Sequence, residues 1–250
     1  MAAVTRRDPW PMLGAVLVVW QGAAWWAGDV ALASPWATGV RLGVLAGRGS
    51  FWGEAGSTAG AFVLAAVGSV VGGVVLGGVL GLSRVVGRVM EPVLASLYAL
   101  PKVTLYPVVL LLFGLSVSAK VAFGIMHGLI PVVLLTMGAV QQVRPVYVRT
   151  ARALRLGPGA AFRHVVLPAV WPEVLGGVRI GVPLALLGVL IGEMFASRRG
   201  LGSMAMRAME VNDTPTLMAV AVLLSLVALG VNAALGWVAA LSGRPAPSAS

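Results

Sequence analysis

Six long apolar runs constrain this 250-residue chain more than any other feature of its sequence. They cover approximately residues 9–27, 58–82, 93–114, 118–140, 174–195 and 215–240. A helix that crosses a bilayer needs about 20 mostly apolar residues, which is close to the length of each run. Within lipid the backbone must satisfy its own hydrogen bonds, and this favours helices over open sheets. The sequence therefore predicts an all-α, polytopic membrane protein with six transmembrane helices, folded as a single domain over residues 1–250.

The composition supports this prediction and excludes several classes of function. Hydrophobic residues make up 59% of the chain and charged residues only 10%, whereas roughly a quarter of a soluble domain is charged. The absence of cysteine excludes disulfides, thiolate metal sites and cysteine nucleophiles. The formal charge of +10 does not indicate nucleic-acid binding, because the basic residues lie between apolar runs and not on one soluble face.

The sequence contains no recognisable arrangement of residues for covalent catalysis, metal binding or nucleotide binding. His127 and His164 have no Asp or Glu at a helical spacing that would form a triad or a metal site. A phosphate-binding loop needs glycines ahead of a Lys that Ser or Thr follows, but valine follows both Lys102 and Lys120. We therefore expect a non-enzymatic chain that binds no cofactor, and whose energy comes from another polypeptide or from an ion gradient.

The distribution of Lys and Arg between the loops predicts the orientation, because positive residues accumulate on the cytoplasmic side. Six spans place both termini on one side of the membrane. That side holds Arg6, Arg7, Arg84, Arg88, Arg144, Arg149, Arg152, Arg155, Arg163 and Arg244. The opposite side holds Arg41, Arg48, Lys120, Arg198, Arg199 and Arg207. The larger group predicts cytoplasmic termini, and the polar, proline-rich tail at 242–250 is expected to be disordered.

Lys102 is the most informative ionisable residue, because charged groups at membrane depth are costly and tend to be functional. It lies in the third run between Pro101 and Pro107, which would break the helix and free backbone carbonyls, as in a helix that lines a cavity. There Lys102 could attract an anionic substrate, and Tyr106 would line the same translocation path. The alternative is that Lys102 extends to the interface or pairs with a helix-end carbonyl.

Two other features of the runs have structural interpretations. Gly73, Gly77 and Gly81 recur at four-residue spacing, which would let a neighbouring helix approach one face closely. General glycine richness explains the same pattern equally well. Glu193, near the outer end of the fifth run, is expected to form a structural ion pair with Arg198 or Arg199.

A basic island between the fourth and fifth runs, residues 144–177, is unusually regular for a loop. Pro145 suits the first position of a helix over Val146–Leu156, on which arginines at every third residue would form one basic stripe: Arg149, Arg152 and Arg155. A turn at 156–159 precedes a second expected helix, Ala160–Val166, that stops before Leu167-Pro168. Such a helix–turn–helix could transmit motion from a cytoplasmic partner.

This island resembles the EAA loop of ABC importer permeases: Glu-Ala-Ala, three residues, Gly, nine residues, Ile, one residue, Leu-Pro. Alignment on Leu167-Pro168 puts Val165 at the Ile position, Arg155 at the Gly position and the triplet on 149–151. Alignment on Gly157 puts the triplet on 151–153 with a two-residue deletion. Neither register restores the acidic residue. The resemblance implies a cytoplasmic coupling loop at 144–172, in which the ATPase-coupling residues are Arg149, Ala151, Arg152, Arg155, Gly157, Val165, Leu167 and Pro168.

Several further motifs look like the nitrate, alkanesulfonate and taurine branch of these permeases. They are LASP (32–35), Glu91-Pro92, the segment 100–116, GEM (192–194) and RGLG (199–202). The resemblance implies a type I importer permease in the bacterial inner membrane, working as a homodimer in lipid with an external binding protein. Two cytoplasmic subunits would hold ATP and Mg²⁺ and hydrolyse ATP. The expected solute is small and anionic, although the same branch also handles pyrimidine-type vitamin precursors.

Two other classes of function remain open at this stage. A secondary transporter driven by an ion gradient would show paired acids within the spans and internal repeats, and both are weak here. A non-transporting scaffold or regulator would explain the altered triplet, but not the prolines around Lys102.

Overall fold

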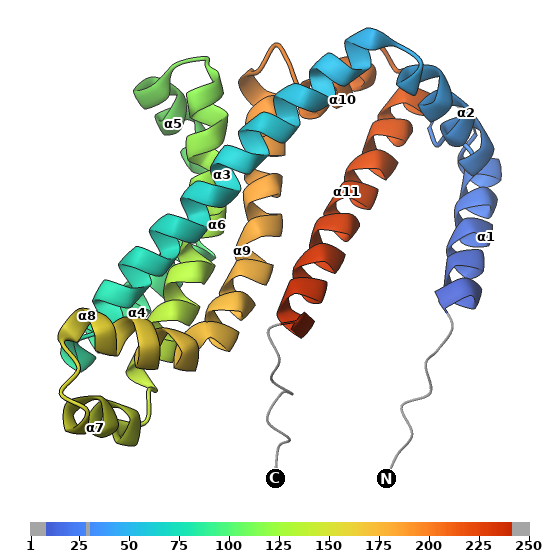
Figure 1. Ribbon diagram of the computed structural model, residues 1–250. Coiled ribbons are helices and arrows are strands. Elements are labelled where there is room, and N and C mark those ends of the chain that lie inside the picture. The colour runs from blue at the N-terminus through green and yellow to red at the C-terminus, as the bar shows by residue number, and fades with distance from the viewer. Residues whose placement is uncertain (1–8, 29–30, 242–250) are drawn as a thin grey trace.

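The computed structural model describes residues 9–28 and 31–241, and every regular element in this part of the chain is helical (Figure 1). The predicted disordered tail and Arg6, Arg7 and Arg244 lie outside the described residues. The elements in chain order are α1 (Pro9–Ala27), α2 (Pro35–Ala46), α3 (Gly49–Gly81), α4 (Arg84–Ala99), the 3-10 turn η1 (Lys102–Leu105), α5 (Tyr106–Phe113), α6 (Val117–Gln141), α7 (Pro145–Ala153), α8 (Pro158–Ala161), the π-helical turn η2 (Phe162–Val166), α9 (Leu167–Ala196), α10 (Leu201–Glu210) and α11 (Thr214–Leu241).

All six predicted apolar runs are helical, but they differ in how well each would cross a membrane. In the described ranges, four helices are long and apolar enough by themselves: α3, α6, α11 and the helix over 159–196 that contains α9. The pair α4–α5 could form a fifth, bent span, and the apolar part of α1, Pro11–Ala27, is shorter. A count of six spans is compatible with these lengths without being fixed by them.

Proline breaks the third run, as the sequence analysis predicts. α4 ends at Ala99, Leu100 is extended with ψ 139°, and Pro101 then precedes η1. Because proline disfavours the α conformation in the residue before it, the helix cannot continue through Leu100. The direction of the chain changes by 87° between α4 and the helical stretch Lys102–Phe113. α5 lies at the same end of the molecule as α10 (Figure 1).

The stretch between the first two runs contains α2 and the beginning of α3. The side chain of Ser34 caps α2 by accepting a hydrogen bond from the Ala37 amide at 3.2 Å, and Pro35 occupies the first turn. α3 then begins at Gly49, earlier than the predicted start at 58. The LASP motif is therefore the start of a helix.

The core of the fold is formed by α6, which packs against α3 on one side and α9 on the other. Glycines make both contacts close. A Cβ atom at Gly77 of α3 would lie 2.6 Å from the Val133 carbonyl oxygen of α6, and one at Gly128 of α6 would lie 2.6 Å from the Gly181 carbonyl oxygen of α9. The predicted glycine face of the second run is therefore confirmed as the surface on which α6 packs.

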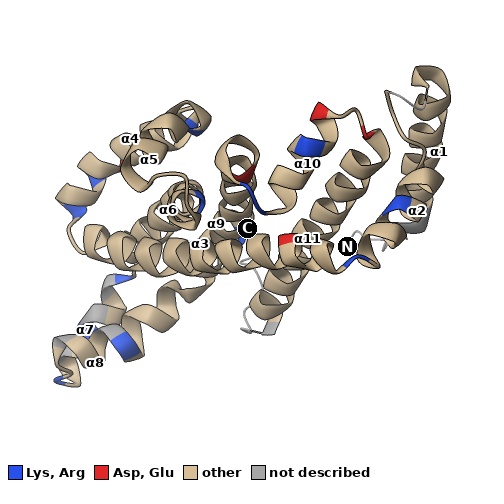
Figure 2. Cartoon of the chain, turned by 90° about the horizontal axis from the view of Figure 1, so that it is seen from above, with Lys and Arg blue, Asp and Glu red and all other residues tan. Residues whose placement is uncertain are grey.

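A second connection joins α2 to α11 at the end of the molecule that carries α10. Arg41 Nη2 lies 2.6 Å from Asp213 Oδ2, and Asp213 Oδ1 caps α11 by accepting from the Thr216 amide at 3.1 Å. Burial opposes ionisation of Asp213. The hydrogen bonds from Thr216 and the charge of Arg41 outweigh this effect and hold the pKa of Asp213 below its usual value. Figure 2 shows acidic and basic residues on α10 and in the turns near it, and a basic residue on α2.

The glycine contact between α3 and α6 can be tested by a single substitution. Gly77→Leu should lower the free energy of unfolding by at least ~1–3 kcal/mol, because a side chain here meets backbone and forces the helices apart. Thermal unfolding of the detergent-purified protein, followed by tryptophan fluorescence, would measure the change. Gly60→Ala, on an open face of α3 with no atom near its Cβ, is the control and should leave the midpoint unchanged or slightly raised. Equal midpoints for the two variants would contradict this packing.

Candidate functional site

The two ends of the molecule carry different polar structures, and α9 joins them. One end holds the basic segment of α7, α8 and η2, while the other holds a buried polar cluster formed by α3, α6, α9 and α10 (Figures 1 and 2). The described ends of α1 and α11 lie on the same side as α7 (Figure 1).

Helix α7 ends in a Schellman turn that contains an unusual residue. The Leu156 amide donates to the Ala151 carbonyl oxygen at 3.0 Å, and Arg155 between them adopts a left-handed conformation with φ 51°. Glycine is the usual residue at this position, since other L-residues pay ~1–2 kcal/mol for the conformation. The EAA pattern aligned on Leu167-Pro168 has its glycine here. Gly157, the anchor of the other register, has no positive φ.

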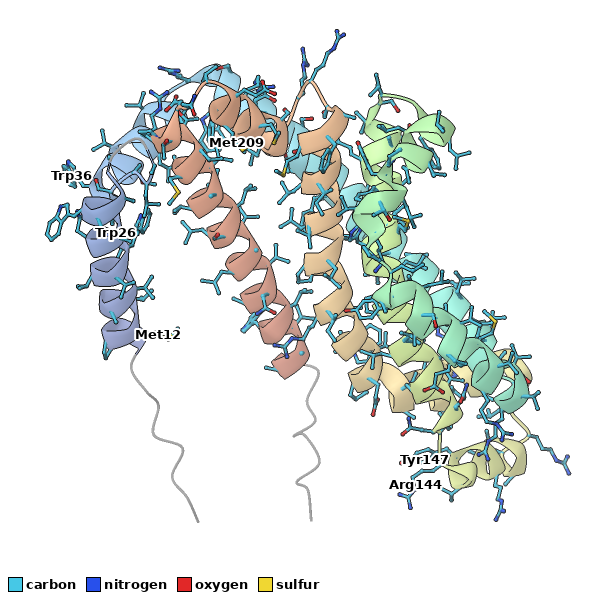
Figure 3. All side chains as sticks on the ribbon, turned by 180° about the vertical axis from the view of Figure 1, so that it is seen from behind. Met12, Trp26, Trp36, Arg144, Tyr147 and Met209 are labelled. Atoms are coloured by element: carbon cyan, nitrogen blue, oxygen red, sulfur yellow. The ribbon has the colours of Figure 1, made fainter. Side chains whose placement is uncertain are left out.

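The predicted coupling residues are distributed over an outer and an inner face. Arg149, Arg155, Gly157 and Pro168 are exposed, whereas Ala151 is buried with an exposed fraction of 4%. Val165 and Leu167 are half-buried. Arg152 lies in α7, but its side chain falls outside the described part of the structure. Figure 3 shows Arg144 and Tyr147 at the start of this segment, at the far end of the molecule from Met209.

The second predicted helix of the island does not stop before Leu167-Pro168, and this expectation is wrong. α8, η2 and α9 follow one another without a break from Pro158 to Ala196. Pro168 falls in the first turn of α9, where its missing N–H is tolerated, and the π-helical turn before it keeps the chain wound. The basic segment is therefore attached to a continuous helix that runs to the opposite end of the protein.

Glu193, near the opposite end of α9, is the most buried charged residue of the described chain, with an exposed fraction of 0%. Lys120 Nζ of α6 lies 2.8 Å from its Oε1 atom. Thr58 Oγ1 of α3 donates to Oε2 at 2.8 Å, and the Gly202 amide of α10 donates to the same oxygen at 3.0 Å. Donors from three helices therefore satisfy one carboxylate, as burial of a charge requires.

The predicted partner of Glu193 is therefore wrong, because the carboxylate pairs with Lys120 and not with Arg198 or Arg199. Arg198 lies in the exposed turn after α9. Lys120 reaches the carboxylate because α6 approaches α9 closely: a Cβ at Gly192 would lie 3.1 Å from the Lys120 Cα atom. The expected structural role of Glu193 in an ion pair stands, with a different cation.

The RGLG segment closes over this carboxylate. Gly200 has φ 129°, and a side chain there would collide with the Glu193 carboxylate. Its amide donates to Glu54, and the Leu201 amide donates to Thr58 Oγ1 at 2.8 Å. Glu54 also pairs with Arg207 of α10 at 2.9 Å. The GEM and RGLG motifs are thus two parts of one cluster, which we name the polar junction (Glu54, Thr58, Lys120, Glu193, Gly200, Gly202).

A cavity of about 690 Å³ opens beside the polar junction, and its lining is basic. Its charged lining residues are Lys120, Arg198 and Arg199. Lys120 lies at the boundary between the two features, because it pairs with Glu193 and also donates to Ser57 Oγ at 3.0 Å. The arrangement can attract an anion to this end of the molecule.

The residues predicted to line a path in the third run occupy other surroundings. Lys102 Nζ donates to the Tyr98 carbonyl oxygen at 2.9 Å, near the end of α4, which is the helix-end pairing considered as the alternative. Tyr106 is buried and donates from its hydroxyl to the Gly192 carbonyl oxygen at 2.7 Å. Pro101 and Pro107 are exposed at the break. Neither Lys102 nor Tyr106 lines the basic cavity, and their role in translocation stays a prediction.

The two histidines hydrogen-bond within their own helical segments. Nδ1 of His127 lies 2.9 Å from the Phe123 carbonyl oxygen, and Nδ1 of His164 lies 3.1 Å from that of Ala160. Within residues 9–28 and 31–241, no group of three or more His, Asp or Glu side chains is placed to hold a metal ion.

The fold and the two polar ends define a class of protein: a polytopic helical membrane protein with a basic helical segment at one end and a buried polar cluster at the other. Residues 69–244 match the family described as binding-protein-dependent transport system inner membrane component. The chain belongs to this family of ABC importer permeases.

Curated relatives carry permease names. The chain is 33% identical over 232 residues to the riboflavin transport system permease protein RibX of Chloroflexus aurantiacus, covering 90% of this chain and 87% of that protein. It is 30% identical to the putative aliphatic sulfonates transport permease protein SsuC of Escherichia coli, covering 88% and 85%. It is 28% identical to the taurine transport system permease protein TauC of Escherichia coli, covering 61% and 57%.

The buried ion pair predicts a large effect of removing one partner. Glu193→Gln should destabilise the protein by ~3–5 kcal/mol, because it leaves the Lys120 ammonium buried without a counter-charge. The double variant Glu193→Gln/Lys120→Met should recover part of that loss, since it removes both charges. Thermal unfolding in detergent compares the two, with Glu210→Gln at the exposed end of α10 as the control. If Glu193→Gln alone unfolds at the same or a higher temperature than Glu193→Gln/Lys120→Met, the ion pair is contradicted.

The left-handed conformation of Arg155 predicts that glycine is better tolerated there than alanine. Arg155→Gly should increase the stability of the α7 terminus by ~1 kcal/mol, whereas Arg155→Ala removes the same charge but keeps the conformational cost. Amide hydrogen exchange of residues 149–156 would report the difference. Gly157→Ala serves as the comparison, because its Cβ meets nothing within 4 Å and its φ is not positive. Faster amide exchange in Arg155→Gly than in Arg155→Ala would contradict the left-handed conformation of residue 155.

Proposed function

We propose that this chain couples to separate cytoplasmic ATPase subunits through the α7–η2 segment and forms the path for a small, anionic solute such as a sulfonate, nitrate or taurine. The observation that carries this proposal is the Schellman turn at Arg155, whose position agrees with the glycine of the EAA pattern. In this mechanism, ATP-driven closure of the ATPase subunits displaces α7, and the continuous helix through α9 passes the displacement to the polar junction.

The outer cavity supports an anionic solute. Arg198 and Arg199 add positive charge to its lining, whereas the charge of Lys120 is balanced by its pair with Glu193. An oxyanion in this cavity would be bound more tightly because of the two guanidinium groups, which form paired hydrogen bonds with planar or tetrahedral oxyanions. The names of SsuC and TauC, which refer to aliphatic sulfonates and taurine, agree with this chemistry.

A vitamin or vitamin precursor is the second candidate solute. The observation that favours it is the 33% identity to RibX over 90% of this chain, because RibX is named for riboflavin transport. A formylaminopyrimidine transport permease protein of Halalkalibacterium halodurans is also similar, at 29% identity over 58% of this chain.

The proposal includes partners and an orientation. The α7 end faces the cytoplasm of a bacterial cell, and the cavity faces an external binding protein that delivers the solute. ATP and Mg²⁺ are held by the ATPase subunits, so this chain holds neither. A second copy of the chain, surrounded by lipid, completes the permease, which agrees with the exposed apolar side chains along α3: Val63, Leu64, Val67, Val71 and Val75.

Reconstituted uptake tests the proposal. The chain is assembled in proteoliposomes with the ATPase and the binding protein that co-purify with it from its native membrane, and uptake of labelled taurine, ethanesulfonate, nitrate and riboflavin is measured with and without ATP. We expect ATP-dependent uptake of one of the anions. Arg198→Gln/Arg199→Gln should lower it about tenfold, the effect of ~1.4 kcal/mol, through weaker attraction of the anion.

The controls separate the two candidate solutes. Glu210→Gln, which alters a charge away from the cavity, should leave uptake unchanged. ATP-dependent uptake of riboflavin alone would contradict the anionic solute while retaining the coupling. Absence of an ATPase complex with this chain, under conditions that preserve a control importer, would contradict the proposal as a whole.

A further inference from the structure

We infer that the ATPase surface that receives the α7–η2 segment is acidic. In the EAA pattern the triplet begins with a glutamate, so the charges in this contact would be the reverse of those in a contact made by that pattern. The inference rests on the proposed function, because it identifies the partner of the same segment. It concerns the chemistry of that partner: a protein groove rich in Asp and Glu.

The charge of the segment is entirely of one sign. Residues 144–166 contain no Asp or Glu, and they contain five arginines: Arg144, Arg149, Arg152, Arg155 and Arg163. Four of these side chains are described, and all four are exposed. In the described part of the chain, the ion pairs are formed by Arg41, Lys120 and Arg207 and involve none of these four. The positive charge is therefore available to a partner.

The placement of the arginines argues that they are directed outward for a contact. Ala151 is buried, and the contacts of α7 are with η2, while Arg149, two residues earlier in the same helix, is exposed. Figure 1 shows α7 beyond the ends of α3 and α9, at the extremity of the molecule. A surface at this extremity is accessible to a protein partner that docks on the end of the helix bundle.

Arg155 provides an independent observation, because its backbone is strained. A left-handed arginine carries a conformational cost that glycine would not, and outliers of this kind tend to mark functional contacts. The left-handed conformation of Arg155 supports the alignment of the EAA pattern on Leu167-Pro168. In that alignment Arg149 takes the place of the glutamate and Arg155 takes the place of the glycine. Both departures add positive charge to the same exposed segment.

The physical consequence is selectivity between ATPases. Each exposed ion pair contributes little by itself and is screened by salt, but several pairs in one contact together change the affinity measurably. An ATPase groove built to receive a glutamate would present positive charge to these arginines, and like charges exclude a wrong partner. The segment therefore favours its own ATPase over those of importers with the acidic triplet.

Binding of the purified ATPase to the detergent-solubilised full chain tests this inference, at 50 and 500 mM NaCl. Arg149→Glu/Arg155→Glu should weaken binding at low salt at least tenfold more than Arg149→Gln/Arg155→Gln, because reversal adds repulsion to the loss of attraction. Replacing Asp and Glu in the ATPase groove by Lys should restore binding of the reversed variant. Arg84→Glu/Arg88→Glu, exposed on the neighbouring helix α4, is the matched control and should bind normally.

The outcomes separate this inference from the function on which it rests. If the unaltered chain binds its ATPase and the reversed variant binds it equally well at 50 mM NaCl, the acidic partner is contradicted and the coupling function stands. If the unaltered chain binds no ATPase, the proposed function fails as well. If reversal abolishes binding to phosphatidylglycerol vesicles but leaves ATPase binding intact, the arginines serve lipid, and the inference is overturned. Each variant should unfold at the same temperature as the unaltered chain, so that a loss of ATPase binding reflects the altered contact and not unfolding.

Discussion

The carboxylate of Glu193 is the interaction on which the arrangement of one end of this protein depends. A buried charge is costly unless it is paired and hydrogen-bonded, and here Lys120, Thr58 and the Gly202 amide each supply a donor from a different helix. Such a pair adds little net stability compared with a well-packed apolar core. It does define how α3, α6, α9 and α10 meet, because moving any one of them leaves the charge unsatisfied.

That requirement links the two ends of the molecule. α9 carries Glu193 at one end and continues through η2 into the basic segment at the other, and α6 packs against α9 closely because glycines lie at the contact. Packed helices of this kind change between discrete arrangements and do not deform continuously. In the mechanism that we propose, a displacement of α7 would reach the polar junction and the basic cavity beside it through η2 and α9.

The sequence predicts local structure well and long-range pairing poorly. Apolar runs locate the helices, prolines locate the break at Pro101, and glycine spacing identifies the face of α3 that packs on α6, since each depends on neighbours in the chain. The partner of Glu193 is 73 residues away in sequence, so a local search finds Arg198 instead. Likewise, Leu167-Pro168 looks like a helix end until the π-helical turn before it is seen, and only the backbone of Arg155 distinguishes the two registers.

If ATP binding by the subunits at the α7 end changes the cavity at the other end, the accessibility of single cysteines in that cavity should change with ATP. The chain contains no cysteine, so Ser116→Cys in the cavity lining can be labelled with a membrane-impermeant maleimide in the reconstituted complex, with Met209→Cys on α10 as the control. We expect ATP to change the labelling rate of Ser116→Cys several-fold and to leave that of Met209→Cys unaltered. Identical rates for Ser116→Cys with and without ATP, in a complex that hydrolyses ATP, would contradict it.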